Sequence, residues 1–341
     1  LSLAQAAKAG GFVQVGIRPE SLPVVHDKSG INYLLTQGKK AGIHLLPLGA
    51  VSRDLAGKDI AELWDMSEAG AVAFTDGVHG IQHAGLMVRA LLYVKAFDGV
   101  VFNQPLDKTI AGSGQMHEGQ ASTMMGTKGI PSIAEEVMVA RDLQLLAYTE
   151  SRLHFSHIAT AGAVEQIRKA KAAGLRVTAS VAALNLLLSD EALSDFDSHL
   201  KVLPPLRHET DRLALIAGLQ DGTIDCISSN HTPLEVELKA LEFAYADFGA
   251  EMLETAFGCA ATALRDHLAQ EAIIACFTTG PRKILGLPAI SIAEGQPAQL
   301  TFYDYHHSWT PGITDIRSRS KNAPLIGYPL IGKPIAVETG L

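Results

Sequence analysis

The chain has 341 residues, of which 47% are hydrophobic and 19% are charged, so it is long enough to bury the core of one large domain or of two smaller ones. Its formal net charge of -8 and its lack of any basic run argue against binding to the phosphate backbone of nucleic acids. No apolar run reaches the roughly 18 residues of a membrane span, and no signal-peptide pattern is present. We therefore expect a cytoplasmic protein with neither nucleic-acid nor membrane partners.

The three cysteines, Cys226, Cys259 and Cys276, are widely spaced and lie in apolar contexts. Their odd number and spacing predict buried free thiols in a reducing compartment rather than a disulfide framework.

Short apolar runs alternate with amphipathic segments along the chain. After a helix predicted over Leu3–Ala9, seven runs predict strands: Phe12–Ile17, Ile43–Val51, Ala71–Thr75, Gly99–Asn103, Leu153–Ile158, Leu175–Val181 and Thr223–Ser228. Helical patterns lie between them, for example over Ile60–Ala69 and Ala163–Ala173. This alternation of strands and helices predicts an α/β fold with a parallel sheet.

A capping box is predicted at Ser132, whose hydroxyl and the Glu135 carboxylate would satisfy the first turn of a helix that runs through Ala147. Seven strands after an initial helix suggest a (β/α)8 barrel of about 250 residues whose first strand is missing from this chain. The chain begins at Leu1 without a methionine, and we expect further sequence upstream. We assign residues 1–289 to the barrel and residues 290–341, which are rich in glycine and proline, to a small β appendage.

Polar residues follow several predicted strands. Asp76, the Asn103-Gln104 pair, His157 and the Asn230-His231 pair all stand where the carboxyl ends of parallel strands meet. Asp76, His157 and His231 could together bind a metal ion, or each could simply hydrogen-bond a loop. Position alone does not decide between these interpretations.

The chain resembles the dihydroorotase family of the cyclic amidohydrolases, and the resemblance extends from Gly10 to Leu341. The matching stretches include "LPLGAVSRDLAGKDIAELWDMSEAGAVAFTDG", "HEGQASTMMGTKGIPSIAEEVMVARDL", "DGTIDCISSNHTP" and "NAPLIGYPLIGKPIAV". The resemblance implies a TIM barrel of the metal-dependent amidohydrolase type. It also implies an origin in the enzymes that close carbamoyl-aspartate into dihydroorotate.

The catalytic positions depart from the family pattern. The family's HxH pair and arginine on the first barrel strand have no counterpart in this chain, whereas Asp76 and His157 fall on metal-ligand positions. Asn103 stands where the family has a histidine ligand, and Asn230 stands where it has the aspartate that binds metal and accepts a proton. Because an amide is a poor zinc ligand and a poor base, we expect no intact catalytic residue and only a vestigial metal site.

Substrate positions have also changed. Leu203 replaces the asparagine of an Asn-Pro-Pro-Leu-Arg motif, and Glu20 lies in the loop that corresponds to Met-Pro-Asn-Thr. Leu184-Asn185 replaces a His-His pair, and Leu234 replaces a histidine. Together with Asn322, which opens the last matching stretch, Glu20 and Leu203 are the predicted vestigial substrate-binding residues.

Three functions remain open. The first is a catalytically degenerate homologue without a cofactor that acts as a scaffold for aspartate transcarbamoylase, as resemblance to non-catalytic family members implies, within a homo-oligomer or hetero-oligomer. The second is an active dihydroorotase, or another cyclic amidohydrolase, with a reduced zinc site built from an upstream HxH pair, Asp76 and His157. The third is a barrel that binds another small ligand through Arg18, Arg207 or His231.

Overall fold

The computed structural model describes residues 2–341 and is centred on a seven-stranded parallel sheet. The strands follow one another across the sheet in chain order: β1 (Gln14–Ile17), β2 (His44–Gly49), β3 (Ala73–Phe74), β4 (Val101–Asn103), β7 (Leu153–Phe155), β8 (Val177–Ala182) and β9 (Cys226–Ser228). Every neighbouring pair is parallel. Each predicted apolar run overlaps one of these strands, which confirms the predicted parallel sheet.

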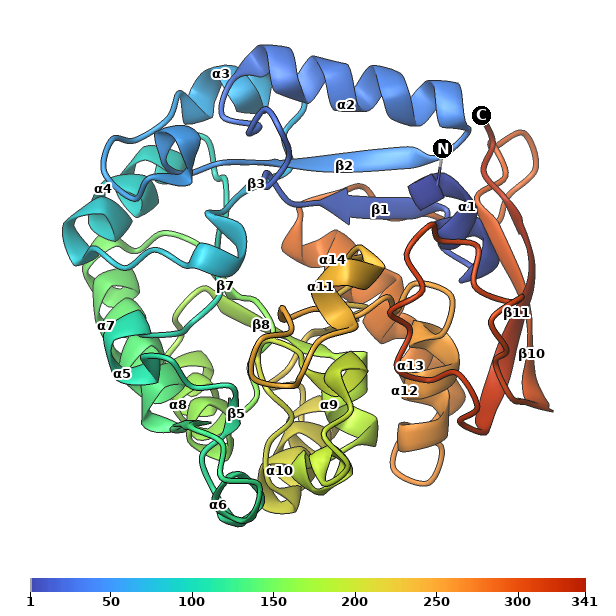
Figure 1. Cartoon of the computed structure of the whole chain (residues 1–341). Helices are drawn as coiled ribbons and strands as arrows, with labels where there is room; N and C mark the ends of the chain where they lie inside the picture. Colours follow the sequence, from blue (N-terminus) through green and yellow to red (C-terminus); the bar gives the residue numbers. More distant parts are fainter. Residues whose placement is uncertain (1) are drawn as a thin grey trace.

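The sheet curls into a half-barrel whose outer face is covered by helices (Figure 1). The connecting helices are α1 (Ser2–Ala9), α2 (Lys28–Ala41), α3 (Leu63–Glu68), α4 (Ala84–Lys95), α7 (Ile133–Thr149), α8 (Ala161–Ala172) and α10 (Glu209–Gln220). The predicted helices over Leu3–Ala9, Ile60–Ala69 and Ala163–Ala173 correspond to α1, α3 and α8. Shorter or later helices are α5 (Lys108–Ala111), α6 (Gln120–Met124), α9 (Ala183–Leu187), α11 (Val236–Lys239), α12 (Ala256–Leu264), α13 (Gln270–Phe277) and α14 (Thr279–Ile284).

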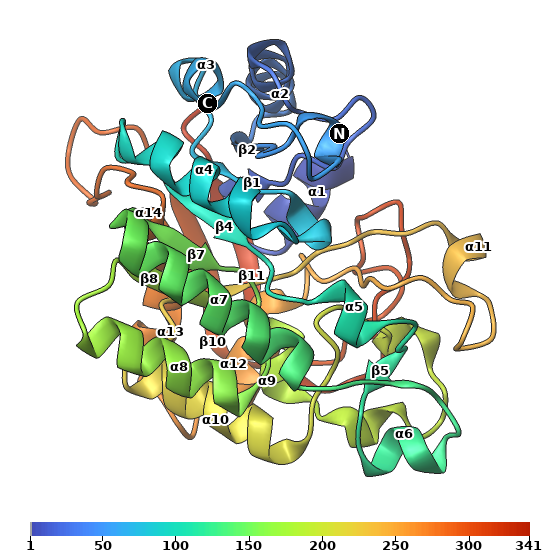
Figure 2. The same ribbon diagram turned by 90° about the vertical axis from the view of Figure 1, so that its left-hand side faces the viewer.

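The main core lies between the sheet and the helical layer. Phe74, Val101 and Phe155 point outward from their strands and pack with buried side chains of the helices, such as Met87 and Val139. Helices α7, α8 and α10 stack side by side on this face (Figure 2). Burying a large apolar side chain contributes about 1.5–3 kcal/mol, so this layer is what fixes the positions of the strand ends.

The predicted capping box at Ser132 is wrong. Helix α7 does begin at Ile133, but the Ser132 backbone is already helical and its side chain makes no capping hydrogen bond. The Glu135 carboxylate is instead fully buried and accepts hydrogen bonds from the Ala159 and Thr160 amides. A glutamate that can satisfy a buried neighbouring loop gains more there than at an exposed helix end, since unpaired buried amides are costly.

Two smaller sheets accompany the half-barrel. Strands β5 (Met116–His117) and β6 (Gly129–Ile130) pair within the segment between β4 and β7. Near the C-terminus, β10 (Leu300–Trp309) and β11 (Leu330–Glu338) form an antiparallel pair, and β11 packs against α12 and α1. The division of the chain at residue 289 and the further barrel strand stay predictions.

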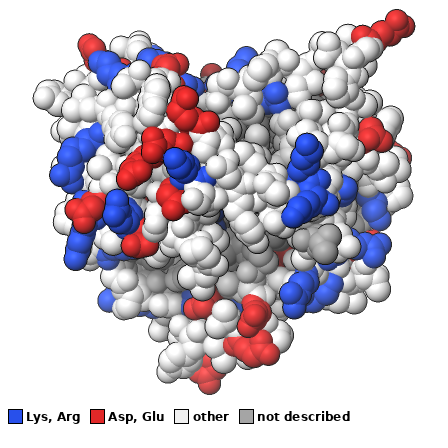
Figure 3. All heavy atoms as spheres, turned by 90° about the horizontal axis from the view of Figure 1, so that it is seen from above, with Lys and Arg blue, Asp and Glu red and all other residues white. Residues whose placement is uncertain are grey.

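Cys226, Cys259 and Cys276 are buried and free, which confirms the prediction of unpaired buried thiols. No helix within residues 2–341 is long and apolar enough to cross a membrane. On the face shown in Figure 3, basic and acidic side chains are interspersed rather than gathered into one basic surface.

Candidate functional site at the carboxyl ends of the strands

The candidate site lies at one edge of the half-barrel, because all seven strands run in the same direction and end there. Its residues come one to three positions after the ends of the strands: Arg18 and Glu20 follow β1, Asp76 follows β3, Gln104 follows β4, His157 follows β7, and Asn230 and His231 follow β9. The inner side of the curled sheet is called the lumen below.

Asp76 is buried, and both of its carboxylate oxygens are engaged by Ser52. The Ser52 amide donates to Oδ1 at 2.8 Å and the Ser52 hydroxyl donates to Oδ2 at 2.6 Å. Burial raises the pKa of Asp76, and the hydrogen bonds from Ser52 oppose this rise. The carboxylate therefore holds the loop that follows β2, and its two oxygens already have protein donors.

The structure places Asn103 on the outer face of the sheet. Its amide nitrogen donates to Oδ2 of Asp142 on α7 at 2.6 Å, and its oxygen accepts from the Ile81 amide at 2.8 Å. Burial raises the pKa of Asp142 to about 6, although the adjacent Arg141 favours the charged form. No hydrogen bond described for residues 2–341 joins the Asn103 side chain to Asp76, His157 or Asn230, so the structure does not bring this residue together with the other predicted ligands.

Gln104 is one of the polar strand-end residues in the sequence, but only its neighbour Asn103 is predicted to be a metal-site residue. Side chains alternate along a strand, so Gln104 shares a face with Phe102, whose ring packs on that of His154 with a centroid separation of 4.2 Å. Gln104 is buried, and its Nε2 has no hydrogen-bond partner in the described part of the chain. A buried amide donor without a partner is unusual and marks the lumen end of β4 as a place where a ligand group or water would be bound.

His157 is a buried, neutral imidazole with a free nitrogen. Its Nδ1 has no partner among residues 2–341, and its backbone amide donates to the Ser180 hydroxyl at 3.1 Å. Burial lowers the pKa of His157 to about 3, and the nearby positive charge of Arg18 adds to this effect. His157 and Asn230 both have left-handed backbones, with φ of 56° and 48°. Such strain in residues other than glycine is concentrated at functional sites.

Asn230 lies against Leu203, so two of the predicted site residues are in contact. The Asn230 amide nitrogen donates to the Leu203 carbonyl at 3.1 Å. The neighbouring His231 ring accepts from the Met252 amide through Nδ1 at 3.2 Å, and burial lowers its pKa to about 4. Both side chains thus act mainly as hydrogen-bond partners of loops.

Arg18 and Glu20 link the end of β1 to two other loops. The Glu20 Oε1 atom accepts from the Val78 amide at 2.8 Å, and the Arg18 guanidinium lies 3.6 Å from Glu20 Oε2 and 3.4 Å from the Thr232 hydroxyl. The Glu20 carboxylate lies directly over Gly77, where a Cβ atom would be only 1.8 Å from Oε1. Glycine at position 77 is therefore required for this placement of Glu20.

Asn322 and Arg207 take structural positions around the site. The buried Asn322 side chain donates to the Thr232 and Gly249 carbonyls at 3.4 and 3.3 Å, which ties down the segment that follows Asn230. Arg207 is also buried, but it donates to the Ile130 carbonyl of β6 at 2.7 Å. Arg207 is thus bonded within the β5–β6 region rather than to the strand-end residues.

The donor set does not fit a binuclear zinc centre, which needs about four to six protein ligands. Within residues 2–341, no three or more His, Cys, Asp or Glu side chains are grouped so that they could hold a metal ion. The oxygens of Asp76 are engaged by Ser52, and Asn103 faces α7. Chemically, this edge offers one arginine, Arg18, the carboxylates of Glu20 and Asp76, and the neutral imidazoles of His157 and His231.

Comparisons with known proteins show which proteins this chain is similar to. A family model described as "Dihydro-orotase-like" matches residues 2–163. The dihydroorotase of Pelotomaculum thermopropionicum is 42% identical over 338 residues, which cover 98% of this chain and 79% of that protein. The dihydroorotase of Syntrophus aciditrophicus is 38% identical over 97% of this chain and 78% of its own length.

The fold is shared more widely. The L-hydantoinase (dihydropyrimidinase) of Arthrobacter aurescens superposes with a TM-score of 0.85 at 22% identity, over 98% of this chain and 77% of that chain. This likeness supports a fold of the amidohydrolase barrel type. The identity to the two dihydroorotases over nearly the whole chain goes further, and it shows that this chain belongs to the dihydroorotase family.

Proposed function

We propose that this chain is a catalytically degenerate, dihydroorotase-like protein of pyrimidine biosynthesis. The observation that carries the proposal is that polar groups at the strand ends are used to hold loops. Asp76 holds Ser52, and Asn230 holds the Leu203 carbonyl. In a working hydrolase such groups would instead converge on a metal-bound nucleophile.

The identity of residue 230 supports the same proposal. An asparagine amide has no basic site near neutral pH and cannot take a proton from an attacking hydroxide. The loss of a positioned general base alone commonly costs a factor of about 10² to 10⁴ in rate. The incomplete set of metal ligands within residues 2–341 adds to that loss, because the same metal would generate the nucleophile.

The proposed role of the degenerate barrel is to bind the catalytic chain of aspartate transcarbamoylase. The wall of the barrel is well ordered although the catalytic residue types at the strand ends have changed. The sheet, the helical layer and the buried contacts of Glu135 with Ala159 and Thr160 support this wall. Resemblance to the non-catalytic members of the family supplies the identity of the partner. A stable shape without an intact site is what a scaffold requires.

Co-expression tests this role. Both chains are produced together and analysed by size-exclusion chromatography with light scattering, and transcarbamoylase produced alone serves as the control. We expect a complex larger than either protein, and greater transcarbamoylase activity or stability in that complex. Transcarbamoylase that elutes at its own mass with full activity in both preparations would contradict the scaffold role.

A second candidate function is favoured by one observation. His157 retains an imidazole nitrogen, Nδ1, that is buried and has no partner in the described part of the chain. A neutral imidazole is a good zinc ligand, so an active cyclic amidohydrolase with a reduced site would use His157 together with ligands outside residues 2–341. Zinc that is retained through purification and lost in a His157→Ala variant would support this alternative.

A further inference from the structure

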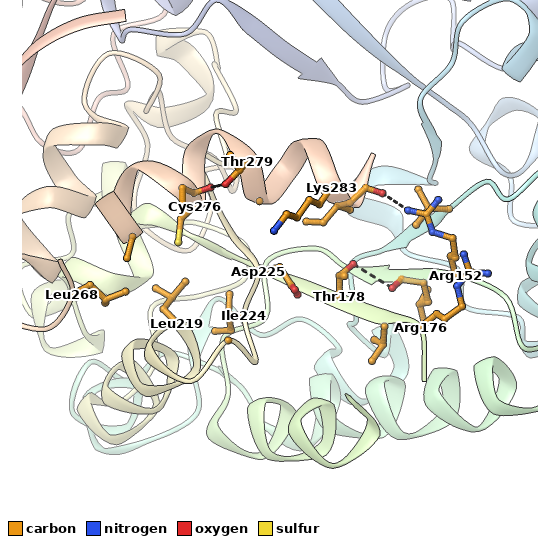
Figure 4. Close-up of a pocket in the computed structure, with 18 residues that line it drawn as sticks. Arg152, Arg176, Thr178, Leu219, Ile224, Asp225, Leu268, Cys276, Thr279 and Lys283 are labelled. Atoms are coloured by element: carbon orange, nitrogen blue, oxygen red, sulfur yellow. Dashed lines mark hydrogen bonds between the residues drawn. The ribbon is translucent and has the colours of Figure 1, made fainter. Parts of the chain in front are cut away.

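A cavity of about 420 Å³ lies at the opposite edge of the sheet from the candidate site. Arg152, Arg176 and Asp225 line it, and each of them directly precedes the first residue of a strand, β7, β8 or β9. Helices α13 and α14 close it from the other side, as Figure 4 shows. Its volume falls within the range of about 300–1,000 Å³ that is typical of small-molecule sites.

One end of the cavity is positively charged. Arg152 and Arg176 share a single carboxylate, that of Asp98, at 3.5 and 2.5 Å. Both oxygens of Asp225 lie 2.8 Å from the Lys171 ammonium, which neutralises that carboxylate. Lys283, on α14, is exposed and has no hydrogen-bond or ion-pair partner within residues 2–341. The two arginines and two lysines thus carry four positive charges against the two negative charges of Asp98 and Asp225, which leaves an excess of two positive charges.

The other end of the cavity is apolar. Leu219 and Ile224 form one wall, and Leu268, Ala272 and the Cys276 thiol form the other. Leu219, Ile224 and Cys276 are at most 9% exposed, so their side chains belong to a packed wall rather than to a loose surface. Figure 4 shows Lys283 and the two arginines toward one side of the cavity and Leu268 and Cys276 toward the other.

The wall formed by α14 is fixed by direct contact between backbones. A Cβ atom at Gly280 would lie 2.3 Å from the Asp225 carbonyl oxygen, so the helix sits directly on the segment that leads into β9. Arg152 also donates to the Ile284 carbonyl at 2.7 Å and so joins the end of α14 to the start of β7. The cavity is therefore preformed, which reduces the entropic cost of binding a ligand.

We propose that this cavity binds a small organic anion. Its carboxylate or phosphate group lies near Lys283 and Arg176, and its short apolar body lies against Leu219, Leu268 and Cys276. Such a ligand makes no contact with the strand-end residues, because it occupies the amino ends of the strands. It acts by stabilising the folded barrel, since a molecule that binds only the native state raises the free energy of unfolding.

Isothermal titration calorimetry with four probes tests the charge and the apolar character separately. Phenyl phosphate and benzoate carry both features, inorganic phosphate carries only the charge, and benzyl alcohol carries only the ring. We expect at least one of the first two to bind with a Kd below about 1 mM, and the last two to bind at least about tenfold more weakly. No binding of phenyl phosphate or benzoate up to about 10 mM would overturn the proposal.

Charge-reversal variants locate the site. Lys283→Glu should weaken binding of the better probe by about tenfold or more, whereas Lys40→Glu, at an exposed lysine of α2, should leave it unchanged. Equal affinities in the two variants would show that the probe binds elsewhere and would contradict the proposed site.

Discussion

Replacing Gly77 by alanine should disrupt the contact between Glu20 and the loop that follows β3. The added Cβ atom would lie 1.8 Å from Glu20 Oε1 and 2.1 Å from its carboxyl carbon, so the Glu20 side chain has to move. In moving, it loses the hydrogen bond that it accepts from the Val78 amide at 2.8 Å. Gly77 also has a φ of 59°, which an alanine adopts only with strain.

The expected cost has two parts. The left-handed backbone costs alanine about 1 kcal/mol relative to glycine. Loss of a hydrogen bond to a charged, mostly buried carboxylate costs about 1.5–3 kcal/mol more. We therefore expect Gly77→Ala to lower the free energy of unfolding by about 2.5–4 kcal/mol. Gly126→Ala is the matched control, because Gly126 has a φ of 64° and no atom lies within 4 Å of its added Cβ, so only the backbone part, about 1 kcal/mol, applies.

Urea unfolding measures the backbone strain and the lost hydrogen bond separately. It is carried out on Gly77→Ala, Gly126→Ala, Glu20→Ala and the Glu20→Ala/Gly77→Ala double variant. Removal of the Glu20 carboxylate should relieve the clash, so that Gly77→Ala costs no more in that background than Gly126→Ala does in the natural sequence. Equal costs for the two glycine variants, or a cost of Gly77→Ala that is unchanged without Glu20, would refute the inferred contact.

Three further predictions concern the site and its surroundings. Elemental analysis after mild purification should find substoichiometric zinc, and two tightly held equivalents per chain would contradict the degenerate site. Asn230→Asp should not restore dihydroorotate hydrolysis in a spectrophotometric assay, because a restored base still lacks an assembled metal site; turnover above background would contradict this. Burial and the adjacent Glu251 raise the pKa of Glu254 to about 8, so the stability that depends on its protonated form is present below about pH 4.5 and is lost as the pH rises toward 8. Glu254→Gln should therefore raise the Tm relative to the natural protein more at pH 8 than at pH 5, and an equal effect at both would contradict the raised pKa.

The strands were predictable because each is a short apolar run bounded by polar or glycine-rich turns, and all seven runs overlap strands of the sheet. The face of a side chain was harder to predict at β4. Val100, Val101 and Phe102 are consecutive apolar residues, so the hydrophobic pattern of this strand does not show which of its faces is the lumen. The sequence therefore predicts that Asn103 lies in the site. In the structure, its amide instead donates to Asp142 on α7, and the adjacent Gln104 shares the face of Phe102.

The predicted capping box at Ser132 is wrong for a similar reason. A Ser-x-x-Glu pattern is compatible with a capping box, but the sequence does not show that buried amides of Ala159 and Thr160 compete for the same carboxylate. The engagement of Asp76 by Ser52 is also a contact between distant segments. Local patterns define the elements of this chain, and its tertiary contacts decide what each polar side chain does.

The most direct test of the degenerate site is a steady-state assay of dihydroorotate ring opening by the purified protein with zinc added. The dihydroorotase of Pelotomaculum thermopropionicum, which is 42% identical, serves as the positive control under the same conditions. We predict a rate indistinguishable from that of buffer containing the same zinc concentration. Turnover above this background that disappears on chelation and returns with zinc would contradict the proposed degenerate site and establish an active metal-dependent hydrolase.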